Sequence, residues 1–191
     1  TRTVSFAVND GTDNSTAVTR TITVTATDQS PIVTTTGGTT NYLGGTAAVT
    51  IDSGITVSDL DNTTQSSATV SVGAGFHSGD ALGFTNTSGA LFGNIAASYN
   101  AATGVMTLTS AGATATDAQW SNALSSVTFS STSTSYGNRT IAFATNDGSK
   151  TSAVATDTVN LLGLPTVTDV SSITPDGSYK IGDTITLTVA F

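Results

Sequence analysis

One strand-turn-strand pattern occurs twice in this sequence, 137 residues apart. The first copy is Arg2–Gly11 (RTVSFAVNDG) and the second is Arg139–Gly148 (RTIAFATNDG). In each copy an alternating strand runs into Asn-Asp-Gly, which favours a turn, and a second β-rich run follows. A unit that recurs at the spacing of a whole domain indicates a tandem array of modules.

The repeat divides the 191-residue chain into three parts. We expect residues 1–30 to be the C-terminal hairpin of a preceding repeat plus a linker. Residues 31–164 are expected to form one complete module. Residues 165–191 are expected to be the first strands of a following Ig-like module, because apolar residues alternate along 185–191.

Short β-rich runs separated by Gly, Asn, Asp and Ser clusters are typical of an all-β Greek-key sandwich. The expected strands lie at 3–8, 17–27, 32–36, 47–51, 55–58, 68–72, 91–96, 105–110, 127–130, 139–145 and 152–161. One stretch differs, because Thr116 to Gln119 fits a capping box and Trp120 and Leu124 lie one helical turn apart. This predicts a single short helix near 117–125 that closes one end of the core.

The composition restricts the chemistry of the chain. All 13 acidic residues are Asp, only 5 residues are Lys or Arg, and the net charge is −8. Without a basic stripe, nucleic acid and anionic membrane surfaces are not expected as partners. The absence of Cys excludes disulfides and thiolate metal sites. No apolar run approaches the roughly 18 residues that a membrane span needs, so no membrane insertion is expected.

Several motifs follow one another in a recognisable order. They are Asp52–Asp61, Ala68–Val72, Ser78–Leu82, Thr103–Leu108, Trp120 with Ala123–Leu124 and Val127–Phe129, and Arg139–Ile141 with Asn146–Gly148. This order resembles the tandem cadherin-like repeats of large bacterial surface adhesins of the RTX-type, type I secreted class. The run Tyr179–Asp183 is similar to Ig-like modules found beside such repeats. The resemblance implies a secreted or cell-surface stalk module in an adhesin, a function associated with biofilms.

A calcium site is predicted where loops meet at one pole of the sandwich. Asp59 and Asp61 lie in one loop, Asn146 and Asp147 lie in another, and Asp28 lies in the incoming linker. Carboxylates and carbonyls are the oxygen ligands that Ca²⁺ takes. In cadherins, calcium at module junctions is held by linker acidic residues plus a D-x-D pair, which these residues resemble. The alternative is turn chemistry alone, since Asp and Asn bond readily to their own backbone.

Two further acidic residues are secondary metal candidates, Asp80 and Asp10. His77, Ser78 and Asp80 contain the side chains of a catalytic triad, but sequence neighbours seldom achieve triad geometry, so no enzyme activity is expected. The aromatic residues and Met106 are expected in the core rather than in a ligand cleft.

The favoured function is therefore a non-catalytic stalk module with a Ca²⁺-rigidified junction, whose partners are neighbouring modules of the same chain. Three alternatives stay open. They are a module that binds glycan or protein, an ancillary module of a secreted polysaccharide-degrading enzyme, and self-assembly in which a terminal segment completes the sheet of a neighbour.

Overall fold

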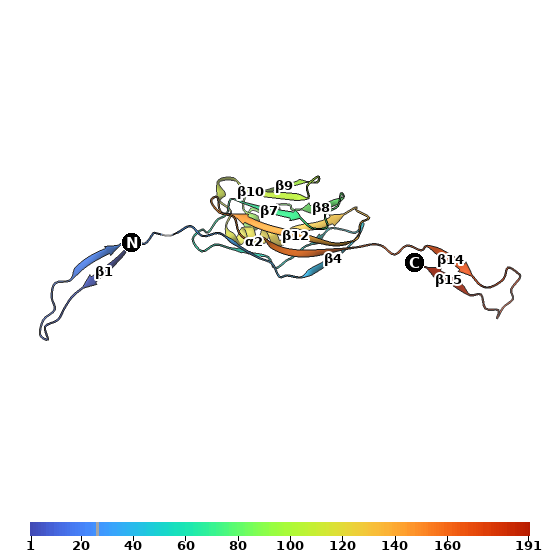
Figure 1. The fold of residues 1–191 in the computed structure, drawn as a ribbon, viewed down its shortest axis with the longest axis horizontal. Coiled ribbons are helices and arrows are strands. Elements are labelled where there is room, and N and C mark those ends of the chain that lie inside the picture. The colour runs from blue at the N-terminus through green and yellow to red at the C-terminus, as the bar shows by residue number, and fades with distance from the viewer. Residues whose placement is uncertain (26) are drawn as a thin grey trace.

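The computed structural model describes residues 1–25 and 27–191. The fold is mostly β, as predicted, with two short α-helices. A central body carries the strands labelled β3 to β13, and a two-stranded hairpin extends from each end of it (Figure 1). The chain therefore enters and leaves the body at opposite ends.

The largest sheet of the body has six strands. They are β4 (Thr39–Leu43), β7 (Ser67–Val72), β9 (Ile95–Asn100), β10 (Val105–Ser110), β12 (Gly137–Asn146) and β13 (Ala155–Leu162). Their spatial order is β4-β13-β12-β7-β10-β9. All neighbours are antiparallel except β4 and β13, which run parallel.

Two smaller sheets complete the body. One has the order β5-β11-β8, and the other pairs β3 with β6. The bounds are β3 (Ile32–Thr34), β5 (Val49–Thr50), β6 (Thr56–Ser58), β8 (Asp80–Gly83) and β11 (Thr128–Ser131). Side chains from both the large and the small sheets meet in one core. Tyr42 of β4 and Phe129 of β11, for example, stack edge to face with ring centroids 5.5 Å apart.

The alternation of apolar residues explains which face of each strand is buried. Along β7, Ala68, Val70 and Val72 point into the core while Thr69 is exposed. Met106 and Leu108 do the same on β10. The prediction that Met106, Trp120 and Phe129 belong to the core is confirmed, since all three are at most 2% exposed.

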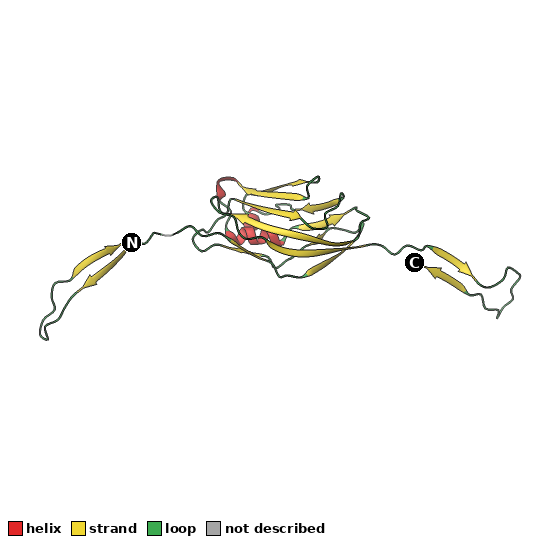
Figure 2. Cartoon of the chain, in the orientation of Figure 1, coloured by secondary structure: helices red, strands yellow, loops and turns green. Residues whose placement is uncertain are grey.

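The predicted helix is confirmed at the expected residues, as α2 (Asp117–Ser125). The Thr116 side chain accepts from the Gln119 amide, and the Gln119 side chain accepts from the Thr116 amide, so both halves of the capping box form. The helix buries Trp120, Ala123 and Leu124 and lies beside the strands of the body (Figure 2).

The prediction of a single helix and several strand predictions need correction. The segment predicted as a strand at 91–96 begins with helix α1 (Gly89–Phe92) and a turn, and β9 starts only at Ile95. Strands β4 and β8 were not predicted, because each is short and rich in polar or small residues. A single buried Tyr42 and pairing with β13 hold β4 in the sheet, which periodicity does not reveal.

The two hairpins outside the body differ in their relation to it. The first joins β1 (Arg2–Phe6) to β2 (Val18–Ile22), and the second joins β14 (Asp169–Ser172) to β15 (Leu187–Ala190). The pairs of β1–β2 run from Arg2↔Ile22 to Phe6↔Val18. The equivalent pairs of β12–β13 run from Arg139↔Val159 to Phe143↔Ala155, which is the same register shifted by 137 residues. The sequence repeat is thus also a structural repeat.

Candidate functional site

The predicted pole joins the linker to two loops of the body. The Gln29 amide donates to Asp61 Oδ1 at 3.0 Å, which ties the linker to the loop after β6. On the other side, Lys150 Nζ donates to the carbonyl of Asp28 and lies 3.9 Å from Asp28 Oδ2. The linker is therefore held by one carboxylate and one ammonium group of the body. We call this set of contacts the junction pole.

The turn that follows β12 uses its polar side chains mostly within itself. Asp147 Oδ1 accepts from the amides of Ser149 and Lys150 at 2.6 and 2.7 Å. Asn146 Oδ1 accepts from the Gly148 amide at 2.8 Å, and Asn146 Nδ2 donates to Thr151 Oγ1 at 2.9 Å. The bonds to the three amides are the side-chain-to-backbone bonds of ordinary Asx turns, and the bond to Thr151 joins two side chains.

Two residues that the sequence did not single out complete the other loop. Gln65 Nε2 donates to Asp117 Oδ1 at 2.9 Å and to Asp59 Oδ2 at 3.4 Å, and the Asp59 amide donates to Asp117 Oδ2 at 3.2 Å. Burial acts to raise the pKa of Asp59, but the Asp61 amide and the Gln65 side chain donate to the carboxylate and keep the pKa below 3.8. Asp117 was predicted only as the first residue of a helix, and the long-range contact was invisible in the sequence.

The residues predicted to bind calcium at the junction pole have protein partners for most of their oxygen atoms. Among residues 1–25 and 27–191, no group of three or more His, Cys, Asp or Glu side chains is placed to hold a metal ion. The carbonyl and carboxylate of Asp28 face the Lys150 ammonium, which repels a cation. Asp147 Oδ1 and the Asp59 carboxylate bind amide donors of their own loops, whereas Asp147 Oδ2 is buried without a hydrogen-bond partner among the described residues. Calcium at this pole stays a prediction, and the contacts themselves describe a joint held by hydrogen bonds and one ion pair.

Asp80 was a candidate metal ligand, and in the structure its carboxylate contacts an arginine and a serine side chain. Asp80 Oδ2 lies 2.7 Å from Arg139 Nε, and Asp80 Oδ1 accepts from Ser131 Oγ at 2.6 Å. Both charged side chains are at most 1% exposed. His77 contributes only backbone groups, since its amide donates to Asp80 Oδ2, its carbonyl accepts from the Asp80 amide, and its side chain is exposed. The carboxylate therefore anchors a buried ion pair, and the geometry brings no triad together.

Asp10, the other secondary candidate, lies in the loop between β1 and β2, at the tip of the hairpin that points away from the body (Figure 1). Its carboxylate accepts from the amides of Thr12 and Asp13 at 2.9 Å each. These two bonds, that from Asp13 first, lower the pKa of Asp10. The arrangement repeats the bonds that Asp147 makes in the second copy.

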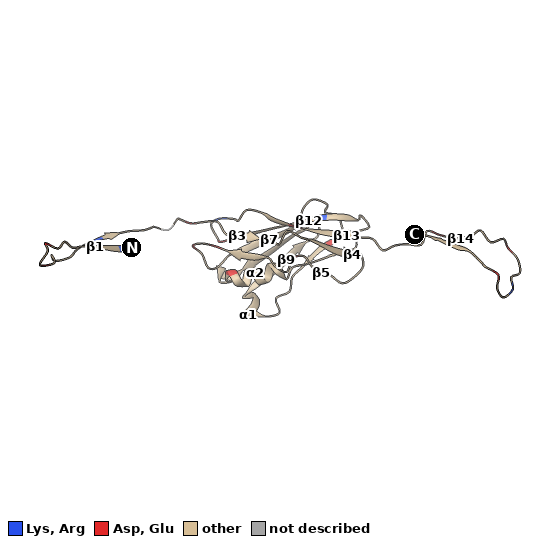
Figure 3. Ribbon diagram, turned by 90° about the horizontal axis from the view of Figure 1, so that it is seen from below, with Lys and Arg blue, Asp and Glu red and all other residues tan. Residues whose placement is uncertain are grey.

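Comparison with models of known protein families finds no match, and comparison with curated proteins finds none. The resemblance to adhesin repeats thus depends on the motifs in the sequence alone. In the described residues, no helix is long and apolar enough to cross a membrane. Few charged segments are visible along the ribbon, and the view in Figure 3 shows no basic stretch.

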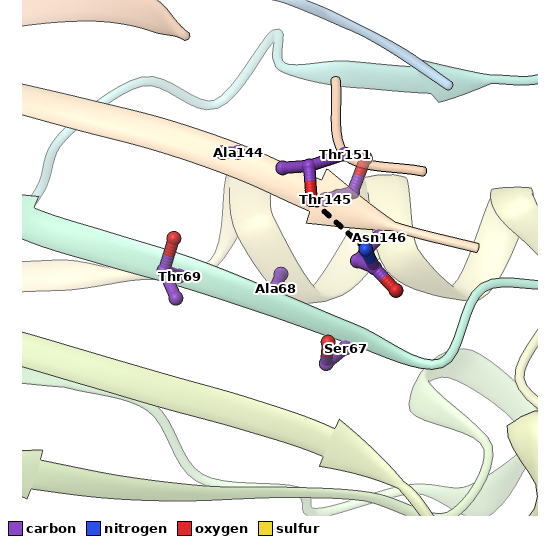
Figure 4. A pocket seen from close by; sticks show the side chains of 7 residues that line it. All are labelled: Ser67, Ala68, Thr69, Ala144, Thr145, Asn146 and Thr151. Atoms are coloured by element: carbon purple, nitrogen blue, oxygen red, sulfur yellow. Dashed lines mark hydrogen bonds between the residues drawn. The ribbon is translucent and has the colours of Figure 1, made fainter. Parts of the chain in front are cut away.

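Cavities of the body have volumes from about 210 to about 460 Å³. One of about 210 Å³ lies between β7 and the end of β12 (Figure 4). It is lined by Ser67, Ala68, Thr69, Ala144, Thr145, Asn146 and Thr151. The hydrogen bond between Asn146 and Thr151 crosses its rim (Figure 4). The lining offers hydroxyl and amide groups but no charged or nucleophilic pair, so we assign it no chemistry.

Proposed function

We propose that residues 31–164 form a Greek-key β-sandwich module, cadherin-like or Ig-like, that serves as a non-catalytic stalk in an extracellular repetitive adhesin. The order of strands, the single core between large and small sheets, and the motifs of the sequence support the fold assignment. The secreted or cell-surface location is part of the same proposal and depends on the resemblance.

One observation carries the stalk proposal, the parallel pairing of β4 with β13. Thr39 lies opposite Thr158 at one end of the pair, and Leu43 lies opposite Leu162 at the other. The incoming linker leads through β3 to the start of β4, and the outgoing linker follows the end of β13 directly. Tension along the chain therefore shears these five pairs together, and bonds loaded together resist more force than bonds opened one after another.

The positions of the two linkers agree with this load path. The chain enters and leaves the body at opposite ends, so modules joined in series form a rod rather than a cluster (Figure 1). At the incoming end, Pro31 is buried and the junction pole holds the linker on both sides. Such a joint limits bending, which is what a stalk requires.

A ligand-binding role has less support. It calls for aromatic side chains gathered on one exposed face, whereas Tyr42, Trp120, Phe129 and Phe143 of the body are at most 1% exposed. Tyr136 is 57% exposed, and no other Phe, Tyr or Trp of the described body is exposed beside it. We therefore keep glycan or protein binding, and an ancillary role in a polysaccharide-degrading enzyme, as alternatives without a structural argument of their own.

Single-molecule stretching tests the proposal. Pulled from its two ends, the chain is expected to unfold its body in one discrete step that releases about 130 residues, a length gain of roughly 400 Å at ~3.4 Å per residue. The control pulls the body through cysteines placed at Ser71 and Ala142, an antiparallel pair of β7 and β12 that is far apart in sequence and whose bonds open one after another. The native chain contains no Cys, so these attachment points are unique. Equal unfolding forces in the two geometries would contradict a load-bearing role.

A further inference from the structure

The β1–β2 hairpin has the same conformation as the β12–β13 hairpin, and this likeness indicates the surface that β1–β2 contacts. Its loop repeats the bonds of the second copy one by one. The Asn9–Asn14 bridge matches the bridge between Asn146 and Thr151. The Val8 amide donates to Ser15 Oγ at 3.0 Å, as the Thr145 amide does to Ser152 Oγ at 3.1 Å. Two segments with the same register and the same turn bonds have the same conformation.

The two hairpins differ in what covers them. In β12–β13, Ile141, Phe143 and Val159 are completely buried by the body. Their equivalents in β1–β2 are Val4, Phe6 and Ile22, which are 36%, 59% and 52% exposed. The hairpin thus carries the full set of core-facing apolar residues without a core, and it forms a sheet of only two strands. Apolar residues in this pattern stabilise a fold only when a second layer covers them.

We propose that β1–β2 is the closing hairpin of a second module, and that its partner is a body built like residues 32–131 that precedes it. The partner pairs with the free edge of β1 as β7 pairs with β12, and with β2 in parallel as β4 pairs with β13. The inference depends on the proposed tandem array and goes further, because it specifies the partner surface.

Charges on the hairpin define that surface more closely. Arg2 is the equivalent of Arg139, whose guanidinium is buried against Asp80. The partner body therefore carries a buried carboxylate at the position of Asp80, since a buried guanidinium without a counter-ion is strongly unfavourable.

A second charge distinguishes the two modules. Arg20 is the equivalent of Asp157, which is 5% exposed and lines one cavity together with the 7% exposed Asp52. An arginine at this position replaces a carboxyl pair by an ion pair. A cavity of about 220 Å³ lies directly beside Asp52 and Asp157, so the body has room for the larger side chain. The partner body thus carries a second buried carboxylate, at the position of Asp52.

A fusion protein tests the inference. A second copy of residues 31–137 is joined to Thr1 of the full chain, so that the added body has no hairpin except β1–β2. Hydrogen exchange at residues 2–24 is expected to slow by on the order of a thousandfold relative to the unfused chain. Phe6→Asp in the fusion is expected to abolish the protection. Thr19→Asp, at the position equivalent to the exposed Thr156, is expected to leave it intact.

Asp157→Arg in the unmodified chain provides a second test that does not require the fusion to fold. It is expected to keep the melting midpoint at or above that of the native chain, and adding Asp52→Asn is expected to lower the midpoint by roughly 10 °C. Unprotected hairpin amides in the fusion, or unfolding caused by Asp157→Arg alone, overturn the inference.

Sedimentation of the 191-residue chain tests whether a second copy of the chain, instead of a preceding body, covers the apolar residues of the hairpin. Dimers that Phe6→Asp dissolves would identify a second copy of the chain as the partner and overturn the inference. These results are separate from the stretching experiment, which reports on the β4–β13 pair and not on the hairpin.

Discussion

Arg139 Nε lies 2.7 Å from Asp80 Oδ2, and neither side chain reaches solvent. The guanidinium also donates to the carbonyls of Ser135 and Gly137, and the carboxylate accepts from Ser131 and the His77 amide. This network links β12 to the strand β8 in the other layer. Because the partners of each charge are supplied by different segments, the ion pair fixes how the two layers meet.

Removing the charge of Asp80 is expected to destabilise the body strongly. Asp80→Asn leaves the Arg139 guanidinium buried without a counter-ion, which costs about 3–5 kcal/mol. Urea unfolding followed by tryptophan fluorescence measures the loss, since Trp120 is the only Trp and lies in the core. Asp169→Asn, in the exposed strand β14, is the matched control. If the two variants unfold at the same urea concentration, the ion pair does not link the layers.

The carboxyl pair of Asp52 and Asp157 predicts an unusual pH dependence. Burial raises the pKa of Asp157 above 3.8, and the neighbouring Asp52 raises it further against the opposing bond from the Thr158 amide. Burial also acts to raise the pKa of Asp52, but the amides of Thr36 and Gly54 and the bond from Asp157 outweigh it, so the pKa falls below 3.8.

Proton linkage gives the direction in which each shifted pKa changes the stability of the body with pH. The raised pKa of Asp157 contributes stability that is present below 3.8 and is lost as pH rises through the folded-state value. The lowered pKa of Asp52 contributes stability that is present above 3.8 and is lost as pH falls through its folded-state value. This pair is therefore most favourable in mildly acidic solution, between the two folded-state values.

Asp157→Asn is expected to stabilise the body at pH 7 by about 1 kcal/mol, because the amide donates to Asp52 without a charge. It is also expected to remove the loss of stability that accompanies rising pH above 3.8. Thermal unfolding between pH 4 and 8 measures both effects, and Asp176→Asn, an exposed position, is the control. If the stability of the native chain and that of the Asp157→Asn variant follow the same pH curve, Asp52 and Asp157 do not share a proton.

The junction pole is expected to loosen when the Lys150 ammonium is removed. Lys150→Met removes the bonds to Asp28 and is expected to broaden the distance distribution between spin labels at Thr21 and Thr69, both exposed. The stability of the body is expected to change by less than about 1 kcal/mol, as for other exposed ion pairs.

Lys180→Met, a charge change in the C-terminal segment, is expected to leave the distances unaltered. The same measurements with calcium and with chelator test the predicted calcium junction of the native chain. Narrower distances with calcium would support it, and distances that coincide would falsify it.

Loss of the helix cap is expected to have a smaller, local effect. Thr116→Ala removes the acceptor of the Gln119 amide and half of the capping box, at a cost of about 1 kcal/mol. Thr116→Ser keeps the hydroxyl and is expected to behave like the native chain. Thermal unfolding monitored at Trp120, four residues into the capped segment, measures the difference. A Ser variant as unstable as the Ala variant would show that the cap is not the cause.

Several strands and one helix could be predicted from the sequence, because their patterns involve residues that are close together in the chain. The alternation in β7, β10 and β12 and the capping box before α2 act within a few residues, so pattern alone placed these elements. The similarity of Arg2–Gly11 to Arg139–Gly148 predicted a repeated hairpin for the same reason, since similar local sequences formed the same hairpin. The linker and the two loops were also correctly expected to meet, because strand order brings their ends to one pole.

The tertiary structure decided what no local pattern contains. Strand β4 exists because β13 offers it a parallel edge, and Asp80 faces Arg139 across 59 residues of sequence. Asp157 and Asp52 become a pair only when two layers close over them. At the junction pole, the sequence supplied the carboxylates, and the fold placed the Lys150 ammonium among them. Electrostatic interactions depend on distance through space, which the order of residues does not specify.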